Sequence, residues 1–173
     1  RKTLDYVVEE LITVNAGSID MLRQVGERSR HHKVWIRVNP GFGHGHSPKV
    51  NTGGENSKHG IWHSDLDQAI DVIDHYNLDL KGVHMHIGSG VDYGHLQRVG
   101  QSMVDIIKTY HLDVSSISAG GGLSIPYRSS DHAIDVHHYF QIWDLARRDI
   151  EQYLGHRVTL EIEPGRYLVA QSG

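Results

Sequence analysis

Four short segments of this sequence carry the side chains and backbone groups that most often do chemistry. They are residues 84–90 (HMHIGSG), 118–127 (SAGGGLSIPY), 161–166 (EIEPGR) and the histidine-containing stretch 41–57. The first three follow runs of residues that are typical of strands. We therefore look for function at the carboxyl ends of strands.

The segment 84–90 places two histidines on one face of a strand. His84 and His86 are two residues apart, a spacing at which both imidazoles can bind one metal ion. Alternatively, His86 lies against a flat cofactor while the hydroxyl of Ser89 and the Gly-Ser-Gly turn hold an anion. In a third interpretation the two histidines simply line a polar lumen. This segment alone leaves all three open.

Three successive glycines, Gly120, Gly121 and Gly122, directly follow another strand. Glycines allow backbone N–H groups to approach an oxyanion closely, as in phosphate-binding nests. The segment is not a P-loop, because the Gly-Lys-Ser/Thr ending is missing, and it lacks the GxGxxG pattern. A flexible turn is the alternative interpretation.

The segment 161–166 ends a strand with Glu163, Pro164, Gly165 and Arg166. A carboxylate at that place can keep a ring nitrogen protonated, and the guanidinium of Arg166 can bind a phosphate or a carboxylate. A salt bridge at the strand end is the alternative.

In the long loop 41–57, His44 and His46 have no carboxylate at a matching spacing, so we expect solvated histidines and no metal site.

These segments must be positioned by strands that alternate with amphipathic helices. Strands are expected at 11–16, 34–39, 80–87, 115–119 and 158–163. Apolar residues three and four apart predict helices over 19–25, 66–73, 96–110 and 139–153, and residues 4–11 are expected to end a preceding helix. This order implies right-handed βαβ units and a parallel sheet.

The period-2 pattern of the strands distinguishes a barrel from a doubly wound sheet. In 34–39, 80–87 and 158–163, one face is apolar and the other becomes polar towards the carboxyl end. A strand covered by helices on both faces would be apolar on both. The predicted fold class is therefore α/β, a partial (β/α)8 TIM-type barrel of about five strands alternating with helices, with its site at the carboxyl-terminal rim.

Composition excludes several classes of protein. The formal net charge of −4 provides no basic face for a nucleic-acid partner. No apolar run reaches the roughly 20 residues that a membrane span requires. The absence of cysteine excludes disulfides and thiolate metal sites, and it favours a cytoplasmic location.

Taken together, in this order and spacing, these segments resemble the diaminopimelate decarboxylases, which are fold-III pyridoxal-phosphate enzymes related to alanine racemase and ornithine decarboxylase. The resemblance covers essentially the whole chain, from 14–18 (VNAGS) through 34–41 (VWIRVNPG) to the last strand. It implies a lyase that uses pyridoxal 5'-phosphate to decarboxylate meso-2,6-diaminopimelate, giving L-lysine and CO₂. It also implies a homodimeric parent protein.

The resemblance implies roles for individual residues in binding the cofactor. His86 would stack on the pyridine ring. Ser89 and the backbone of Gly120, Gly121 and Gly122 would bind the cofactor phosphate.

It implies further roles for three charged residues. Glu163 would hydrogen-bond the ring nitrogen and, with His86, be catalytic. Arg166 would engage either the phosphate or the substrate carboxylate. Arg37 would lie near the phenolic oxygen of the cofactor.

The chain also departs from the family pattern. None of its six lysines has the sequence context of the lysine that attaches the cofactor in the family, and the C-terminal β-domain, with its cysteine, is missing. A closed barrel takes about 250 residues. We therefore expect 1–173 to be the carboxyl-proximal part of the barrel, inactive alone. The alternatives are a metal-dependent barrel hydrolase using His84, His86 and Glu163, or a non-catalytic barrel fragment.

Overall fold

Strands and helices alternate along the chain, as the sequence predicts. The computed structural model describes residues 2–42, 58–86, 92–170 and 172. The strands are β1 (Val14–Ala16), β2 (Lys33–Asn39), β3 (Ile61–Trp62), β4 (Asp79–His84), β5 (Ser116–Ser118) and β6 (Thr159–Glu161). The α-helices are α1 (Lys2–Glu9), α2 (Ile19–Gly26), α3 (Leu66–Tyr76), α4 (Tyr93–Thr109), α5 (Val136–Leu154) and α6 (Gly165–Val169), and a 3₁₀ turn covers His63–Asp65.

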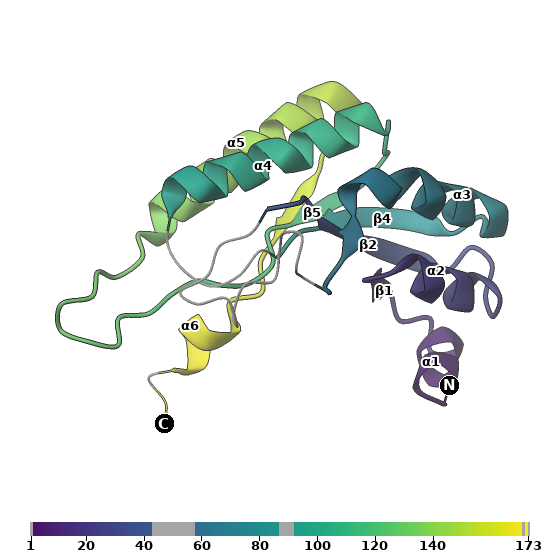
Figure 1. Ribbon diagram of the computed structural model, residues 1–173, viewed down its shortest axis with the longest axis horizontal. Helices are drawn as coiled ribbons and strands as arrows, with labels where there is room; N and C mark the ends of the chain where they lie inside the picture. Colours follow the sequence, from purple (N-terminus) through teal and green to yellow (C-terminus); the bar gives the residue numbers. More distant parts are fainter. Residues whose placement is uncertain (1, 43–57, 87–91, 171, 173) are drawn as a thin grey trace.

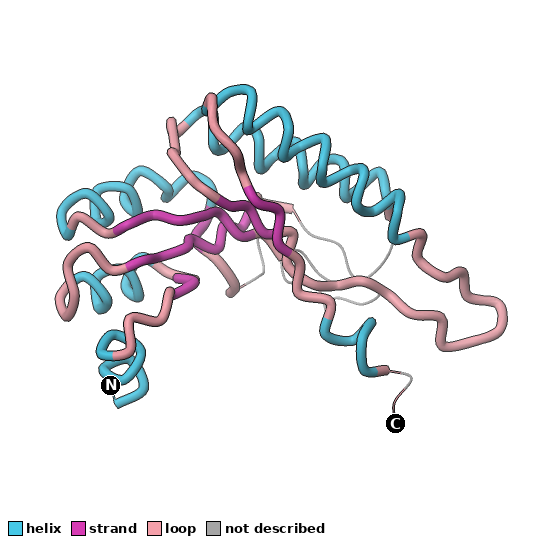
Figure 2. Tube along the Cα trace, turned by 180° about the vertical axis from the view of Figure 1, so that it is seen from behind, coloured by secondary structure: helices cyan, strands magenta, loops and turns pink. Residues whose placement is uncertain are grey.

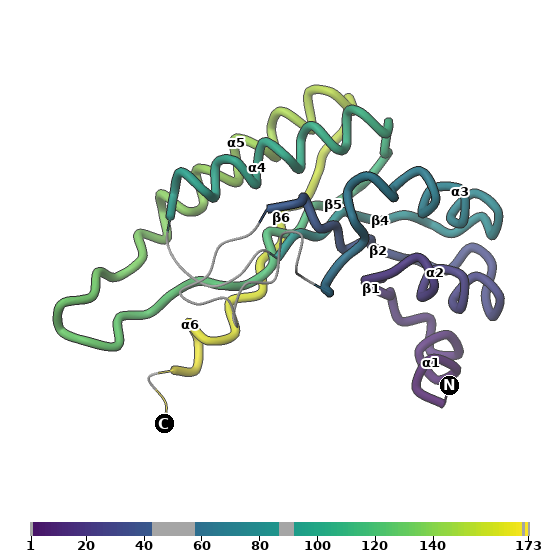
Figure 3. The backbone as a smooth tube through the Cα atoms, in the orientation of Figure 1, coloured from purple at the N-terminus to yellow at the C-terminus, as the bar shows by residue number. Residues whose placement is uncertain are grey.

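The strands are parallel and follow one another in sequence order. The sheet runs β1-β2-β4-β5-β6, and the short β3 pairs with β2. The colours of these strands accordingly advance from purple to yellow across the sheet (Figure 3). A doubly wound sheet reverses its order at a switch point. This sheet has no reversal among the described strands, which confirms the predicted barrel-type winding.

The pairing register separates an apolar face of the sheet from a polar one. One row of paired residues across five strands is apolar throughout, and it consists of Ala16, Ile36, Val83, Ile117 and Leu160. The first four of these are completely buried, within a core to which the helices contribute their apolar stripes. Helices α4 and α5 lie side by side over the sheet (Figures 1 and 2).

The opposite face of the sheet carries the polar row that the functional site uses. It pairs Arg37 of β2 with His84 of β4, His84 with Ser118 of β5, and Ser118 with Glu161 of β6. These residues stand at or near the carboxyl ends of their strands. The sequence periodicity predicted this polar face, and the register aligns its members.

Local capping explains where the longer helices begin and end. The side chains of Asp92 and Asp135 accept backbone N–H groups in the first turns of α4 and α5, which satisfies donors that a helix start leaves unpaired. Helix α5 ends at Leu154 and is capped by Gly155, whose φ of +76° is the left-handed conformation that glycine adopts without strain. Within the described ranges, no helix is both long and apolar enough to cross a bilayer.

The expected strand bounds were too long at their carboxyl ends. The strand predicted over 158–163 ends at Glu161, and the one predicted over 80–87 ends at His84. Past Glu161 the N–H of Glu163 still donates to the carbonyl of Gly120, at 2.9 Å. Gly120, with a φ of +64°, leaves the extended conformation, however, and Pro164 has no N–H to continue the ladder. Strand β3 and helix α6 were not predicted, because two and five residues are too short to show a period.

Candidate active site

A pocket of about 250 Å³ opens at the carboxyl ends of the central strands. Its lining comes from the ends of β2 and β4, the glycine turn after β5, the segment that joins β6 to α6 and the first turn of α6. The lining residues are Arg37, His84, His86, Gly121, Gly122, Leu123, Glu163, Gly165 and Arg166.

Glu163 and His84 are in direct contact in this pocket. Oε1 of Glu163 lies 3.2 Å from Nε2 of His84, which is only 3% exposed. Burial lowers the pKa of His84, the charge of Arg37 lowers it further, and the Glu163 carboxylate opposes both. The imidazole is therefore neutral near pH 7. Because an ionised carboxylate only accepts hydrogen bonds, the single proton of His84 belongs on Nε2.

His86 has the same tautomer for a different reason. Its Nδ1 accepts a hydrogen bond from the backbone N–H of Gly121, at 2.9 Å. A ring nitrogen that accepts must be unprotonated, so the proton of neutral His86 is on Nε2. Burial lowers the pKa of His86, and the neighbouring Arg37 and His84 lower it further. Both imidazoles of the pocket are therefore uncharged.

The glycine turn lies against His86. Gly120 and Gly122 have φ of +64° and +94°, conformations that few other residues adopt readily. The N–H of Gly120 donates to the Ser118 hydroxyl at 3.2 Å, and that of Gly121 donates to His86. Within the described residues, the N–H of Gly122 has no hydrogen-bond partner, so it is the donor of this turn that is free to bind an anion.

The charges of the pocket favour an anionic ligand. Arg37 is half-buried and its Nη2 donates to the carbonyl of His86 at 3.4 Å. Burial lowers the pKa of Arg37, and the Glu163 carboxylate opposes this shift, but a guanidinium stays protonated in proteins. With neutral histidines, two arginines and Glu163 leave the described lining one positive charge. Such a pocket suits a molecule that carries a phosphate.

The structure brings together most of the residues singled out from the sequence. Arg37, His86, Gly121, Gly122, Glu163 and Arg166 all line the pocket. Gly120 packs behind His86, where an added Cβ would lie 2.6 Å from that residue's Cβ. Ser89, His44 and His46 lie outside the described residues.

His84 was not among the cofactor-binding residues predicted from the sequence. The sequence suggested it as a metal ligand or as a residue lining a polar lumen, and the structure shows it in the pocket beside the carboxylate of Glu163. The signal was its position on the same strand face as His86. What the sequence could not give is the register that brings the end of β4 close to the segment after β6.

Comparison with known proteins decides the family. The pyridoxal-binding domain of the pyridoxal-dependent decarboxylases matches residues 1–170 of this chain. The chain belongs to the pyridoxal-dependent decarboxylase family. This confirms the resemblance found in the sequence and identifies pyridoxal phosphate as the cofactor of the family.

Within the pyridoxal-dependent decarboxylases, highly similar relatives of this chain include diaminopimelate decarboxylases. The enzyme of Escherichia coli K12 is 60% identical over 171 residues, which are 99% of this chain and 41% of the relative. That of Streptomyces coelicolor is 59% identical over 173 residues, 100% of this chain and 39% of the relative. The chain thus spans about two fifths of the length of these curated relatives.

Solved structures of this decarboxylase family share the fold. A crystal structure of diaminopimelate decarboxylase has a TM-score of 0.95 at 59% identity, over 99% of this chain and 41% of that one. A Helicobacter pylori diaminopimelate decarboxylase complexed with L-lysine has a TM-score of 0.83 at 23% identity, over 98% and 44%. The predicted α/β fold class is confirmed.

The alternative of a metal-dependent hydrolase finds no support. In the described parts of the chain, no group of three histidine, aspartate or glutamate side chains is arranged to hold a metal ion. His84 is directed at Glu163, and Nδ1 of His86 is occupied by the N–H of Gly121. The relatives found point to a decarboxylase.

Proposed function

We propose that the protein containing this chain decarboxylates meso-2,6-diaminopimelate to L-lysine, with pyridoxal 5'-phosphate as cofactor. The observation that carries the proposal is the convergence of Arg37, His86, Glu163 and Arg166 on one pocket of positive charge. The 60% identity to the Escherichia coli diaminopimelate decarboxylase supports the choice of substrate.

The pocket offers suitable groups for each part of the cofactor. The flat imidazole of His86, held by Gly121, would stack on the pyridine ring. The free N–H of Gly122, together with Ser89, would bind the phosphate, with Gly120 and Gly121 shaping the turn. Arg166, in the first turn of α6, would bind the phosphate or the substrate carboxylate, and Arg37 would serve the phenolic oxygen.

Glu163 is the residue that governs the electronic state of the cofactor. When bound, pyridoxal phosphate supplies an electron sink for the electron pair left by departing CO₂. The carboxylate of Glu163 would accept a hydrogen bond from the ring N–H and hold the proton at that nitrogen. Because His84 and His86 are neutral, neither imidazole places a positive charge beside this carboxylate.

We further propose that residues 1–173 are the carboxyl-proximal part of the barrel domain of a longer, cytoplasmic, homodimeric protein. The early barrel strands would supply the lysine that attaches the cofactor, and a C-terminal β-domain would contribute to the site of the partner subunit. Residues 1–173 alone would then be inactive. No nucleic-acid or membrane partner is proposed.

The test uses a full-length polypeptide that contains these residues. We expect an absorption band of protein-bound pyridoxal phosphate that shifts when meso-diaminopimelate is added, together with release of CO₂. Glu163→Gln should lower kcat by about 100-fold or more, in the range of a general acid–base contribution. The matched control is Glu10→Gln, which changes an exposed carboxylate beyond the end of α1. A polypeptide with neither the band nor CO₂ release would overturn the proposal.

A further inference from the structure

The carboxylate of Glu163 needs an anchor that its own backbone does not provide. Glu163 lies two residues beyond β6, and its side chain is 58% exposed. A half-exposed glutamate has several accessible rotamers, and fixing one of them costs conformational entropy. Among the described residues, the ion-pair contact of this side chain is with His84, at 3.2 Å.

His84 has the properties of a rigid anchor. It is the last residue of β4 and is paired on both sides, with Arg37 of β2 and Ser118 of β5. Its ring is almost completely buried, with 4% of the side chain exposed. The imidazole therefore holds its position whether or not Glu163 is in contact with it.

The protonation of His84 suits it to hold Glu163 without neutralising it. In the described part of the chain, neither ring nitrogen of buried His84 has a well-aligned hydrogen bond. Nε2, however, lies 3.2 Å from Oε1 of Glu163, a carboxylate oxygen that only accepts. A neutral ring that donates from Nε2 satisfies this arrangement. A lysine or arginine at this place would place a positive charge beside Glu163 and weaken its attraction for a second proton-bearing partner.

We propose that His84 is a positioning residue for Glu163, whose carboxylate it fixes through a hydrogen bond from Nε2–H to Oε1. The second oxygen, Oε2, is thereby left to accept from a protonated ring nitrogen. The inference rests on the proposed function, since it assigns His84 a role towards the group that Glu163 serves. Its test is separate, because the variants are compared only after the wild-type full-length protein has been found to bind the cofactor.

The experiment compares three variants of the full-length protein. His84→Leu removes the donor. His84→Gln keeps an N–H donor about as far from the backbone as Nε2. His32→Leu is the matched control, because His32 is equally buried, at 3%, and its Nε2 contacts the carbonyl of Ile12, outside the pocket.

The main readout is the ¹⁵N chemical shift of the pyridine nitrogen in bound, labelled pyridoxal phosphate, which reports its protonation. We expect a protonated shift in the wild type, His84→Gln and His32→Leu, and a shift towards the unprotonated value in His84→Leu. In that variant kcat should fall by about 10- to 100-fold, as when an outer partner of a functional group is lost, with KM changed less.

Several outcomes would overturn the inference. One is a His84→Leu variant that keeps the wild-type ¹⁵N shift and kcat. Another is a His32→Leu variant whose kcat falls as far as that of His84→Leu, since the effect would then follow from losing any buried histidine. If His84→Leu does not fold, His84→Gln decides: a folded variant with an unprotonated ring nitrogen contradicts the proposed hydrogen bond. A wild-type protein without bound cofactor refutes the proposed function instead.

Discussion

Two imidazoles of the pocket, those of His84 and His86, are uncharged although the Glu163 carboxylate favours their charged form. Burial is the largest cause in both cases, and it lowers both pKa values. Each ring also has a partner that fixes its tautomer, the carboxylate of Glu163 for His84 and the N–H of Gly121 for His86. The two histidines therefore add positive charge to the site when the pH falls far enough to protonate them.

This predicts how stability changes with pH. A histidine with a lowered pKa resists protonation in the folded state, so its contribution is fully present above the unfolded pKa of about 6.5 and is lost as pH falls towards the folded pKa. The Tm of the wild type should fall between pH 7 and pH 5. His86→Gln should show a smaller decrease, as measured by calorimetry over that range.

His156 serves as a control for the measurement on His86, because its pKa is shifted in the opposite direction. Its bond to the carbonyl of Arg157 and its contact with Asp113 raise its pKa, so its contribution is present below about pH 6.5 and is lost as pH rises through the folded pKa. The Tm difference between the wild type and His156→Gln should therefore grow as pH falls. Equal slopes in the His86 and His156 variants would contradict both assignments.

Gly120 allows the close approach between the glycine turn and β4. A Cβ added at Gly120 would lie 2.6 Å from the Cβ of His86 and 2.7 Å from the carbonyl oxygen of Met85. In addition, the φ of Gly120, +64°, is unfavourable for alanine. Gly120→Ala should destabilise the fold by about 1–3 kcal/mol, the usual cost of overpacking and strain. Thermal unfolding measures this. Gly17→Ala is the control, because its Cβ would have no atom within 4 Å.

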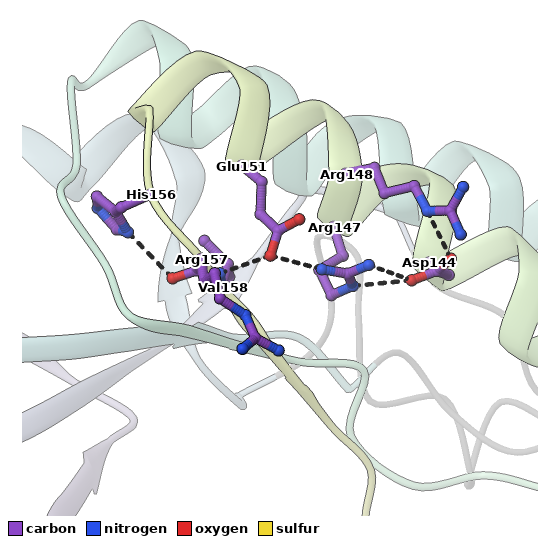
Figure 4. A network of polar contacts seen from close by, with 7 residues as sticks. All are labelled: Asp144, Arg147, Arg148, Glu151, His156, Arg157 and Val158. Atoms are coloured by element: carbon purple, nitrogen blue, oxygen red, sulfur yellow. Dashed lines mark hydrogen bonds and ion pairs between the residues drawn. The ribbon is translucent and has the colours of Figure 1, made fainter.

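At the scale of elements, a polar network joins the end of α5 to the start of β6 (Figure 4). Glu151 of α5 accepts the backbone N–H of Val158 at 2.9 Å and contacts Nη1 of Arg147 at 2.6 Å. Arg147 in turn contacts Asp144, which is buried. The network therefore fixes the turn between α5 and β6, and β6 in turn leads to Glu163.

The network predicts an acid-sensitive stability. The N–H of Val158 and the charge of Arg147 lower the pKa of Glu151, so its contribution is present above the unfolded value near 4.5 and is lost as pH falls through the folded pKa. Glu151→Gln should lower Tm at pH 7 but much less at pH 3. Glu27→Gln, at an exposed site, is the control. A Tm difference that is the same at both pH values would contradict the role of the charge.

The sequence predicts the helices and strands better than it predicts the tertiary contacts between them. Apolar spacing gave the order and kind of the five main strands and four main helices, because long amphipathic runs have a clear period. It could not give the contact between His84 and Glu163, which are 79 positions apart and brought together by strand register. Nor could it show that Gly121 donates to His86, since that depends on the local turn.

At the scale of the whole molecule, the sheet is open on both sides. In the described part of the chain, β1 pairs only with β2, and β6 pairs only with β5. Several apolar side chains near the second edge are exposed, among them Ile162, Leu168 and Val169. Unpaired strand edges and exposed apolar groups favour association with other chains.

We therefore predict that residues 1–173, expressed alone, associate into dimers or larger assemblies. Light scattering coupled to size-exclusion chromatography should give a mass above 19.5 kDa that increases with protein concentration. A full-length polypeptide should not show this concentration dependence beyond its native oligomer. A monodisperse monomer of residues 1–173 would contradict the prediction and favour an independently folding unit.

The sequential strand order has a further consequence for biosynthesis. Because β1, β2, β4, β5 and β6 are neighbours in the order in which they are translated, each strand leaving the ribosome meets a partner that is already present. Pairing between consecutive strands also keeps loop closures shorter than pairing between distant strands would, although each parallel pair still needs a crossover connection. Within residues 1–173, the segment that carries Glu163 emerges after the other strands, and only then can its carboxylate contact the imidazole of His84.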